Sequence, residues 1–272
     1  MPEGHVIHRL AIGLTDWFGG RPVRVSSPQG RFADEAALLD GGVLNGAEAY
    51  GKHLFVDFGP DRIVHIHLGL IGKLWLIEGD PTSPAGPETL RLRIARGELS
   101  AELRGPQWCR LITDQTRDAV IAKSGDDPIR SDSTGDRAWA RISRSGRSIA
   151  ALLMDQGVTA GVGNIYRAEV LFRHRINPFR PGQTITRRTW SAVWADLVGL
   201  MRDGVSEGRI DSVREEHLPE VMGRAPRVDR HGGEVYVYRR AGLPCLVCGT
   251  PVRTQLLEGR NLYWCPRCQR KR

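Results

Sequence analysis

The chain has 272 residues, 40% of them hydrophobic, and a formal net charge of +8. This length allows one large or two ordinary domains with a buried core, and the positive charge favours a polyanionic partner. No apolar run approaches the ~18 residues of a membrane-spanning helix, and the first residues lack a signal-peptide pattern. We therefore expect an intracellular protein whose cysteines bind metal rather than form disulfides.

The first predicted element is a helix over residues 3–18, where apolar side chains recur at helical spacing until a Gly-Gly pair. Proline is tolerated at the start of a helix, which gives Pro2 an ordinary structural explanation. It also has a chemical one. Removal of Met1 would make Pro2 a terminal secondary amine with a pKa of about 8, which is nucleophilic at neutral pH. Glu3 lies beside that amine and is placed to move protons.

Short strands are predicted from Arg21 to about Ile121, because apolar residues alternate there with polar ones. Many short strands broken by Gly and Pro predict a β-sandwich or a barrel-like domain. His65 and His67 lie on one face of a strand. Since the sequence offers no third ligand nearby, hydrogen-bonded histidines are favoured over a metal site.

The second half of the chain has helical periodicity. Residues 123–137 are polar and rich in turn formers, and we interpret them as an interdomain linker. Two helices then flank a glycine-rich turn, and Asn164 is expected to cap the second. A helix that opens with free N–H groups can hold a phosphate, although a simple helical hairpin explains the glycines equally well. Residues 208–234 are charged and predict a mobile loop.

The most specific pattern lies near the C-terminus, where two Cys-x2-Cys pairs are separated by sixteen residues. This spacing predicts a zinc ribbon with four thiolate ligands. Because the set leaves no open position, we expect one structural Zn²⁺ per chain. Apolar residues between the pairs predict a β-hairpin with Arg260 near its tip. The predicted ligands are Cys245, Cys248, Cys265 and Cys268.

Taken together, these motifs resemble the formamidopyrimidine-DNA glycosylase / endonuclease VIII family of base-excision repair enzymes. The resemblance covers the full length of the chain. The matching segments are Pro2-Glu3-Gly4, Gly51-Lys52-His53, the helix–two-turn–helix sequence DQGVTAGVGNIYRAEVLF at 155–172, and the four-cysteine finger with Arg260. The resemblance implies a two-domain α+β fold. Its parts are a β-sandwich with a flanking N-terminal helix (1–122), the linker (123–137), a helix–two-turn–helix domain with the mobile loop (138–234), and a zinc-finger β-hairpin (235–272).

The resemblance also implies a role for each matched residue. Pro2 would attack C1′ of a damaged nucleoside, and Glu3 would be the acid/base that aids opening of the sugar ring. Lys52 would contact phosphate near the lesion and assist the elimination. Asn164 and Arg260 would grip the phosphates beside a flipped nucleotide. The reaction would release the base and then cleave the strand through a Schiff base, by β- and δ-elimination.

The lesion preference is a finer expectation. The segment His67–Gly72 is similar to the family's intercalation loop, in which Leu70 and Ile71 would fill the void left by the flipped base. The opening Pro-Glu-Gly is similar to endonuclease VIII, and the methionine and aromatic wedges of the 8-oxoguanine enzymes are absent here. We therefore expect oxidised pyrimidines as substrates, with 8-oxoguanine and formamidopyrimidine lesions as the alternative.

The partner and location follow from the same resemblance. It implies a monomer that binds damaged double-stranded DNA, has no membrane partner and works in the cytoplasm, associated with the nucleoid. Glu169 matches a family carboxylate with a structural role. A non-catalytic damaged-DNA-binding protein is the alternative from another class, and the joint presence of Pro2, Glu3 and Lys52 argues against it.

Overall fold

The structure is a computed structural model that describes residues 2–79, 87–229 and 233–270. The predicted removal of Met1, and the basic residues Lys271 and Arg272, therefore concern positions outside the described residues. The chain divides into two compact units, Met1–Lys123 and Ser124–Arg272. Among the described residues, no helix is both long and apolar enough to cross a membrane.

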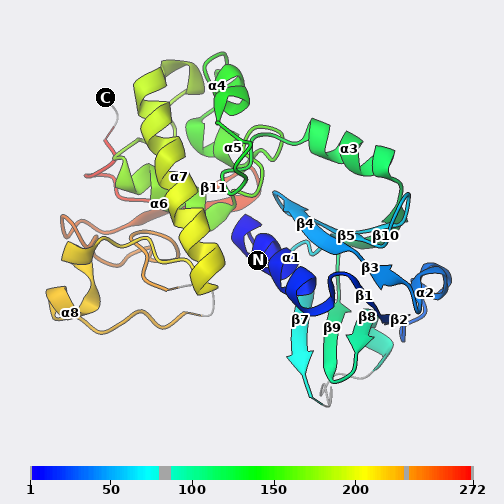
Figure 1. Cartoon of the computed structure of the whole chain (residues 1–272). Coiled ribbons are helices and arrows are strands. Elements are labelled where there is room, and N and C mark those ends of the chain that lie inside the picture. The colour runs from blue at the N-terminus through cyan, green and yellow to red at the C-terminus, as the bar shows by residue number, and fades with distance from the viewer. Residues whose placement is uncertain (1, 80–86, 230–232, 271–272) are drawn as a thin grey trace. The chain divides into compact units, whose positions relative to one another are not determined.

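The described part of unit 1, Met1–Lys123, contains ten strands. They are β1 (Arg21–Pro22), β2 (Arg24–Ser26), β3 (Val43–Leu44), β4 (Gly46–Tyr50), β5 (His53–Asp57), β6 (Ile63–His67), β7 (Lys73–Glu78), β8 (Leu90–Arg96), β9 (Leu99–Arg104) and β10 (Trp108–Ile112). Two antiparallel four-stranded sheets have the orders β10–β6–β5–β4 and β2–β8–β9–β7 (Figure 1). Both sheets supply side chains to one core, which confirms the predicted β-sandwich.

The N-terminal helix is α1 (Gly4–Phe18), as predicted. Its apolar stripe, including Ile7, Leu14 and Phe18, is buried in the core of the sandwich, and the helix packs on β4 and β5. The start of the helix is buried as well, because Glu3 is only 1% exposed. The first turn is therefore held against the sheet, unlike the loose ends of most chains.

Unit 1 contains helices where only strands were predicted. They are α2 (Ala33–Leu39) and α3 (Asp114–Lys123), with a short 3-10 helix at Pro87–Thr89. The strand pattern therefore ends at Ile112 rather than near Ile121. None of the side chains of α3 is buried. The helix thus has no buried stripe, and its sequence lacks the periodicity by which a helix is recognised.

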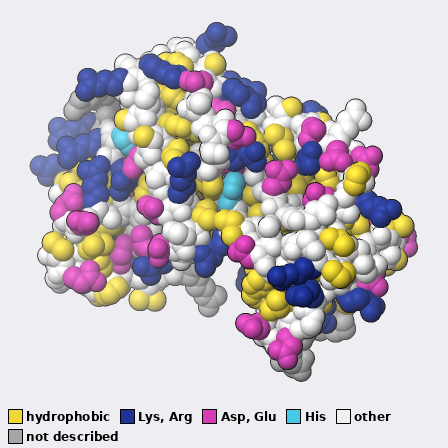
Figure 2. Space-filling model, viewed as in Figure 1, with side chains coloured by type: hydrophobic (Ala, Val, Ile, Leu, Met, Phe, Trp, Pro, Cys, Tyr) yellow, Lys and Arg dark blue, Asp and Glu magenta, His cyan; other side chains and the backbone are white. Residues whose placement is uncertain are grey.

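Unit 2 combines helices with a C-terminal hairpin. Its elements are α4 (Asp136–Ile142), α5 (Ile149–Met154), α6 (Asn164–Arg173), α7 (Arg187–Glu207), α8 (Pro219–Met222), β11 (Arg253–Leu257) and β12 (Arg260–Trp264), with 3-10 turns at Gly182–Thr184 and Glu215–His217. One core is shared by the four helices α4, α5, α6 and α7 and by β12, and it includes Tyr166, Trp190 and Trp264. Lys and Arg side chains gather over this unit at the left of Figure 2.

The segment interpreted as a linker is packed rather than loose. Residues 124–128 are buried in unit 2. The carboxylate of Asp126 accepts a 3.0 Å hydrogen bond from the N–H of Ala138, and its backbone forms a bridge with Thr159. Hydrogen bonds of this kind allow polar residues to be buried, which composition alone does not reveal.

Candidate active site and nucleic-acid interface

The first candidate residues lie at the start of α1. Glu3 is the N-cap residue, and its carbonyl accepts a 3.0 Å hydrogen bond from the N–H of Val6. The positive end of the helix dipole favours a carboxylate at this position. Pro2, which precedes it, is half-buried. Burial, with a smaller effect from His8, lowers the pKa of His5 to about 4, so this neighbouring ring is neutral at pH 7.

Lys52 lies on a tight turn between β4 and β5. Tyr50 and His53 form the last pair of the hairpin, which leaves Gly51 and Lys52 as a two-residue loop. Gly51 has a φ of 58°, as the first central position of a type II′ turn requires. The half-buried Lys52 is thus fixed at one end of the sheet on which α1 packs.

A cluster of aromatic side chains lies beside this turn. His53 Nδ1 and His65 Nε2 share a 3.0 Å hydrogen bond, and the ring of His67 stacks on Trp108 at 4.5 Å. His65 is therefore hydrogen-bonded, as predicted. Burial is the main cause that lowers the pKa of His67, and the charge of Lys52 is the next. The charge of Lys52 thus acts on His67, where the predicted intercalation loop begins.

Sequence reasoning missed two members of this cluster, His53 and Trp108. Strand pairing brings both residues to the cluster. Trp108 pairs with His67, and β5, which carries His53, pairs with β6. The alternation of β6 alone points to His65 and His67. Finding the other two requires the pairing of three strands, which a single sequence does not provide.

The turn between β6 and β7 exposes two apolar side chains. Leu70 is 55% and Ile71 81% exposed. The backbone beneath them is tight, because a Cβ at Gly72 would lie 2.3 Å from the carbonyl oxygen of Leu68. Exposed apolar residues at a rigid tip are typical of a binding surface.

Asn164 is the first residue of α6 rather than its cap. Gly163 is the N-cap, so the predicted capping role of Asn164 is wrong by one position. The Asn164 side chain instead donates a 2.9 Å hydrogen bond to the carbonyl of Asn261 and accepts one from Arg167. Short polar side chains readily form such bonds away from their own helix end. The N-terminus of α6 is thereby joined to β12.

The tip of the zinc hairpin has a defined conformation. Glu258 and Gly259 have φ values of 45° and 74°, as a type I′ turn requires. Glu258 forms a 3.0 Å salt bridge with Arg147, which also pairs with Asp155 at 2.7 Å. Within the described chain, the guanidinium of Arg260 has one hydrogen-bond partner, the carbonyl of Gly259 at 3.5 Å. Most of its donors are thus available to a ligand.

The four predicted zinc ligands converge. The Sγ atoms of Cys245, Cys248, Cys265 and Cys268 all lie within 4.8 Å of one another. Two of the distances between them are 3.9 Å and 3.5 Å. Sulfurs bound tetrahedrally to zinc at about 2.3 Å would lie about 3.8 Å apart, so the set fits the ion. Gln269 joins the second knuckle to the helices, because its side chain donates to the carbonyl of Ile176 at 2.9 Å.

Models of known protein families match both units of the chain. Residues 1–105 match the formamidopyrimidine-DNA glycosylase N-terminal domain, 124–215 its H2TH domain, and 242–270 the zinc finger found in FPG and IleRS. Endonuclease 8 1 of Mycobacterium tuberculosis is 51% identical over 274 residues, which cover 99% of this chain and 100% of the relative. The chain belongs to the formamidopyrimidine-DNA glycosylase family. Family members are DNA glycosylases with AP lyase activity.

Other relatives of this glycosylase agree with that assignment. Formamidopyrimidine-DNA glycosylase of Aromatoleum aromaticum is 31% identical over 283 residues and covers both chains fully. The crystal structure of MutM (Fpg) from Thermus thermophilus has a TM-score of 0.75 at 25% identity and covers 98% of each chain. Lactococcus lactis Fpg, solved with DNA containing an abasic site, has a TM-score of 0.78 at 20% identity, covers 99% of this chain and 100% of its own, and supports the fold. The predicted family, fold class and structural zinc are confirmed.

One carboxylate of the glycosylase is fully buried. Glu169 on α6 accepts hydrogen bonds from Ser212 Oγ at 2.6 Å and from the N–H groups of Tyr236, Val237 and Tyr238 at 2.7, 2.9 and 2.8 Å. Four donors compensate for its burial. Both ends of the segment predicted as a mobile loop are therefore fixed to α6, and its described part carries the 3-10 turn Glu215–His217 and α8.

The candidate residues of the glycosylase are divided between the two units. Unit 1 holds Pro2, Glu3, Lys52, Leu70 and Ile71, whereas unit 2 holds Asn164, Arg260 and the four cysteines. Within unit 2, Asn164 and the hairpin that carries Arg260 are directly bonded through Asn261.

Proposed function

We propose that this glycosylase excises oxidised pyrimidines from double-stranded DNA and then cleaves the strand by β- and δ-elimination. The observation that carries the proposal is the burial of Glu3 at the N-cap of α1, directly after Pro2. A chain terminus fixed in this way can hold an amine and a carboxyl group in one geometry, as covalent catalysis requires.

The reaction begins once Met1 has been removed. The amine of Pro2 attacks C1′, the bond from C1′ to the base breaks, and the base leaves with the electron pair and a proton. Glu3 donates a proton to the ring oxygen as the sugar opens, which leaves a cationic iminium between Pro2 and C1′. The iminium acidifies the protons on C2′. Loss of one of them expels the 3′ phosphate, and a second elimination expels the 5′ phosphate.

The remaining residues hold the nucleic acid in this proposal. Lys52 binds phosphate near the lesion and assists the elimination, while Asn164 and Arg260 grip the flanking phosphates. Leu70 and Ile71 enter the stack in place of the flipped nucleotide. We infer that the protein acts on DNA as a monomer, with no membrane partner. We also propose that it works in the cytoplasm, associated with the nucleoid.

The preference for pyrimidines rests on two observations. The relative named Endonuclease 8 1 is 51% identical, whereas the formamidopyrimidine-DNA glycosylase of Aromatoleum aromaticum is 31% identical. The exposed tip residues are Leu70 and Ile71, whereas the family resemblance implies a methionine at this place in the 8-oxoguanine enzymes. The second candidate function is excision of 8-oxoguanine and formamidopyrimidine lesions.

A substrate panel with a nucleophile variant tests both levels of the proposal. Wild-type enzyme should excise 5-hydroxyuracil and thymine glycol from duplex DNA faster than 8-oxoguanine, and borohydride should trap it on abasic DNA. Pro2→Gly, confirmed by mass spectrometry to lack Met1, should lose most trapping and excision but keep its affinity for DNA. Wild-type rates in this variant would remove Pro2 from the mechanism. Faster excision of 8-oxoguanine would leave the lyase chemistry in place and refute the pyrimidine preference.

A further inference from the structure

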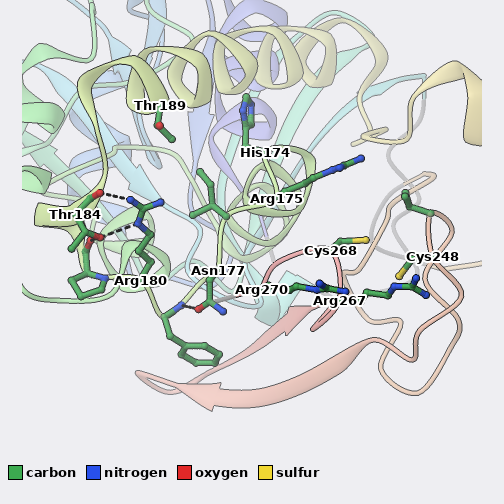
Figure 3. Close-up of a pocket in the computed structure, with 14 residues that line it drawn as sticks. His174, Arg175, Asn177, Arg180, Thr184, Thr189, Cys248, Arg267, Cys268 and Arg270 are labelled. Atoms are coloured by element: carbon green, nitrogen blue, oxygen red, sulfur yellow. Dashed lines mark hydrogen bonds between the residues drawn. The ribbon is translucent and has the colours of Figure 1, made fainter. Parts of the chain in front are cut away.

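A cavity of about 950 Å³ lies in unit 2, where the C-terminal end of α6 meets the zinc knuckles (Figure 3). No Asp or Glu is among the described residues that line it. Part of the wall is apolar and includes Ile176, Phe179 and Val247. Four arginines complete it, namely Arg175, Arg180, Arg267 and Arg270.

The arginines line the cavity without protein counterions among the described residues. Arg175, Arg267 and Arg270 are exposed, and no ion pair joins any of them to another described residue. Arg180 is oriented by Thr184, whose hydroxyl accepts a 2.9 Å hydrogen bond from Arg180 Nε (Figure 3). Like charges gathered in one concave site repel one another and concentrate a positive potential that attracts anions.

The zinc site neutralises only part of the positive charge of these arginines. Cys248 and Cys268 line the same cavity. A zinc ion with four thiolates carries about −2 charges in total. Four guanidinium groups therefore leave an excess of about +2, since arginine stays protonated. This excess favours an anionic ligand at the cavity.

The backbone at Arg175 is unusual as well. The N–H groups of Arg175 and Ile176 bond to the carbonyls of Phe172 and Leu171, both at 2.9 Å, and close α6 with a Schellman motif. Arg175 occupies the left-handed position of this motif, with a φ of 53°. Glycine is the usual residue there because it has no Cβ. The arginine is thus placed at the edge of the cavity at a conformational cost.

The cavity lies far from the phosphate site of the proposed function. That site is at the N-terminus of α6, where Asn164 bonds to Asn261 near the hairpin tip. The ten residues of α6 separate its two ends by about 15 Å. The hairpin runs alongside, with its tip at Asn164 and its knuckle at the cavity. The predicted phosphate contacts at Asn164 and Arg260 therefore lie about one length of α6 from the cavity.

We propose that this cavity is a docking site for an acidic peptide segment of a partner protein. The carboxylates pair with Arg175, Arg267 and Arg270, and an aromatic or aliphatic side chain of the segment packs against Phe179 and Val247. Val247 is 41% exposed, which leaves apolar surface for such a contact. A nucleic-acid backbone also carries anions but offers no apolar group to fill this wall. Arginine forks pair bidentately with carboxylates, and buried apolar anchors beside them are typical of peptide sites.

Fluorescence anisotropy with a synthetic probe tests the proposal. The probe is a fluorescein-labelled peptide with a run of aspartates followed by two phenylalanines. It should bind the zinc-loaded enzyme saturably, and replacing either the aspartates or the phenylalanines by serine should abolish binding. The double variant Arg175→Glu/Arg270→Glu should weaken binding by about tenfold or more. The matched double variant Arg62→Glu/Arg202→Glu, which makes the same charge change at two exposed arginines outside the cavity lining, should weaken it far less.

Two further measurements separate docking from other roles. Thr189→Trp places bulk in the cavity without changing charge, and should also weaken the probe while zinc content and DNA affinity stay unchanged. If the double variant loses zinc, Thr189→Trp alone decides. The proposal is wrong if the probe does not bind, or if it binds Thr189→Trp as tightly as wild type. It is also wrong if duplex DNA displaces the probe and the double variant loses DNA affinity with a lower salt dependence, because the cavity then holds nucleic acid.

Discussion

At the scale of single residues, the hydrogen bond between His53 and His65 constrains protonation. One ring nitrogen must donate and the other accept, so the two imidazoles cannot both be charged while the 3.0 Å contact persists. Burial, followed by the charge of His67, lowers the pKa of His53 to about 4, and burial with the charges of His53, His67 and Arg110 lowers that of His65 to about 3.

These shifts predict how stability depends on pH. In the unfolded chain a histidine has a pKa of about 6.5, so below that pH the unfolded state binds more protons than the folded state. The stability contributed by the neutral rings is complete above about pH 6.5 and is lost as pH falls toward 4. In His65→Gln, the free energy of unfolding should fall less steeply with decreasing pH than in the wild type. The slope should be smaller by ~1.4 kcal/mol per pH unit, because one fewer proton is taken up on unfolding. Urea titrations between these pH values measure the slope, and equal slopes for the two proteins would contradict the prediction.

At the scale of elements, the β11–β12 hairpin presents Arg260 at its type I′ turn. If Arg260 clasps a phosphate, Arg260→Ala should weaken DNA binding by about 1.5–3 kcal/mol and reduce the slope of log K against log salt by about 1. Arg260→Lys should restore part of the affinity, since it keeps the charge without the planar fork.

A variant of the same hairpin controls this measurement. Arg253 is exposed at the start of β11, at the opposite end of the hairpin from the turn. Arg253→Ala should leave both affinity and salt slope close to wild type. Overlapping salt titrations for Arg260→Ala and wild type would mean that Arg260 is only a solvated turn residue.

The zinc knuckles belong to this scale too. Cys245 and Cys265 are part of a small core with Phe172, Tyr236 and Val252, so loss of the metal should loosen the end of α6 as well as the hairpin. Cys265→Ser should therefore lose zinc and DNA binding, because structural zinc modules fold with their metal. Atomic absorption measures the zinc, and hydrogen exchange should show β5 and β6 still protected.

The buried free thiol of unit 1 supplies the matched control. Burial raises the pKa of Cys109 to about 12, which keeps it protonated and unsuited to metal binding. Cys109→Ala should accordingly retain full zinc content. Zinc retained at wild-type level in Cys265→Ser would remove that residue from the ligand set.

At the scale of the whole molecule, the sequence predicted those features whose chemistry requires fixed residue types at fixed spacing. The four clustered cysteines and the apolar stripe of α1 are of this kind, and so is the sandwich, with its alternating strands. The features it did not predict depend on tertiary partners. Trp108 joins the histidines through strand register, Asn164 turns from its own helix to Asn261, and Asp126 is buried because it accepts the N–H of Ala138.

The four hydrogen bonds to Glu169 have a consequence for how the molecule can vary. The chain leaves this carboxylate at Ser212 and returns to it at Tyr236. The intervening segment is thus a loop whose two ends are both hydrogen-bonded to the side chain of Glu169 on α6. Doubling the length of such a loop costs only about 0.6 kcal/mol of closure entropy. We therefore expect insertions in this segment to cost little free energy of unfolding, provided that the buried Val235 and the bonds of Arg214 and His217 to Tyr236 are kept.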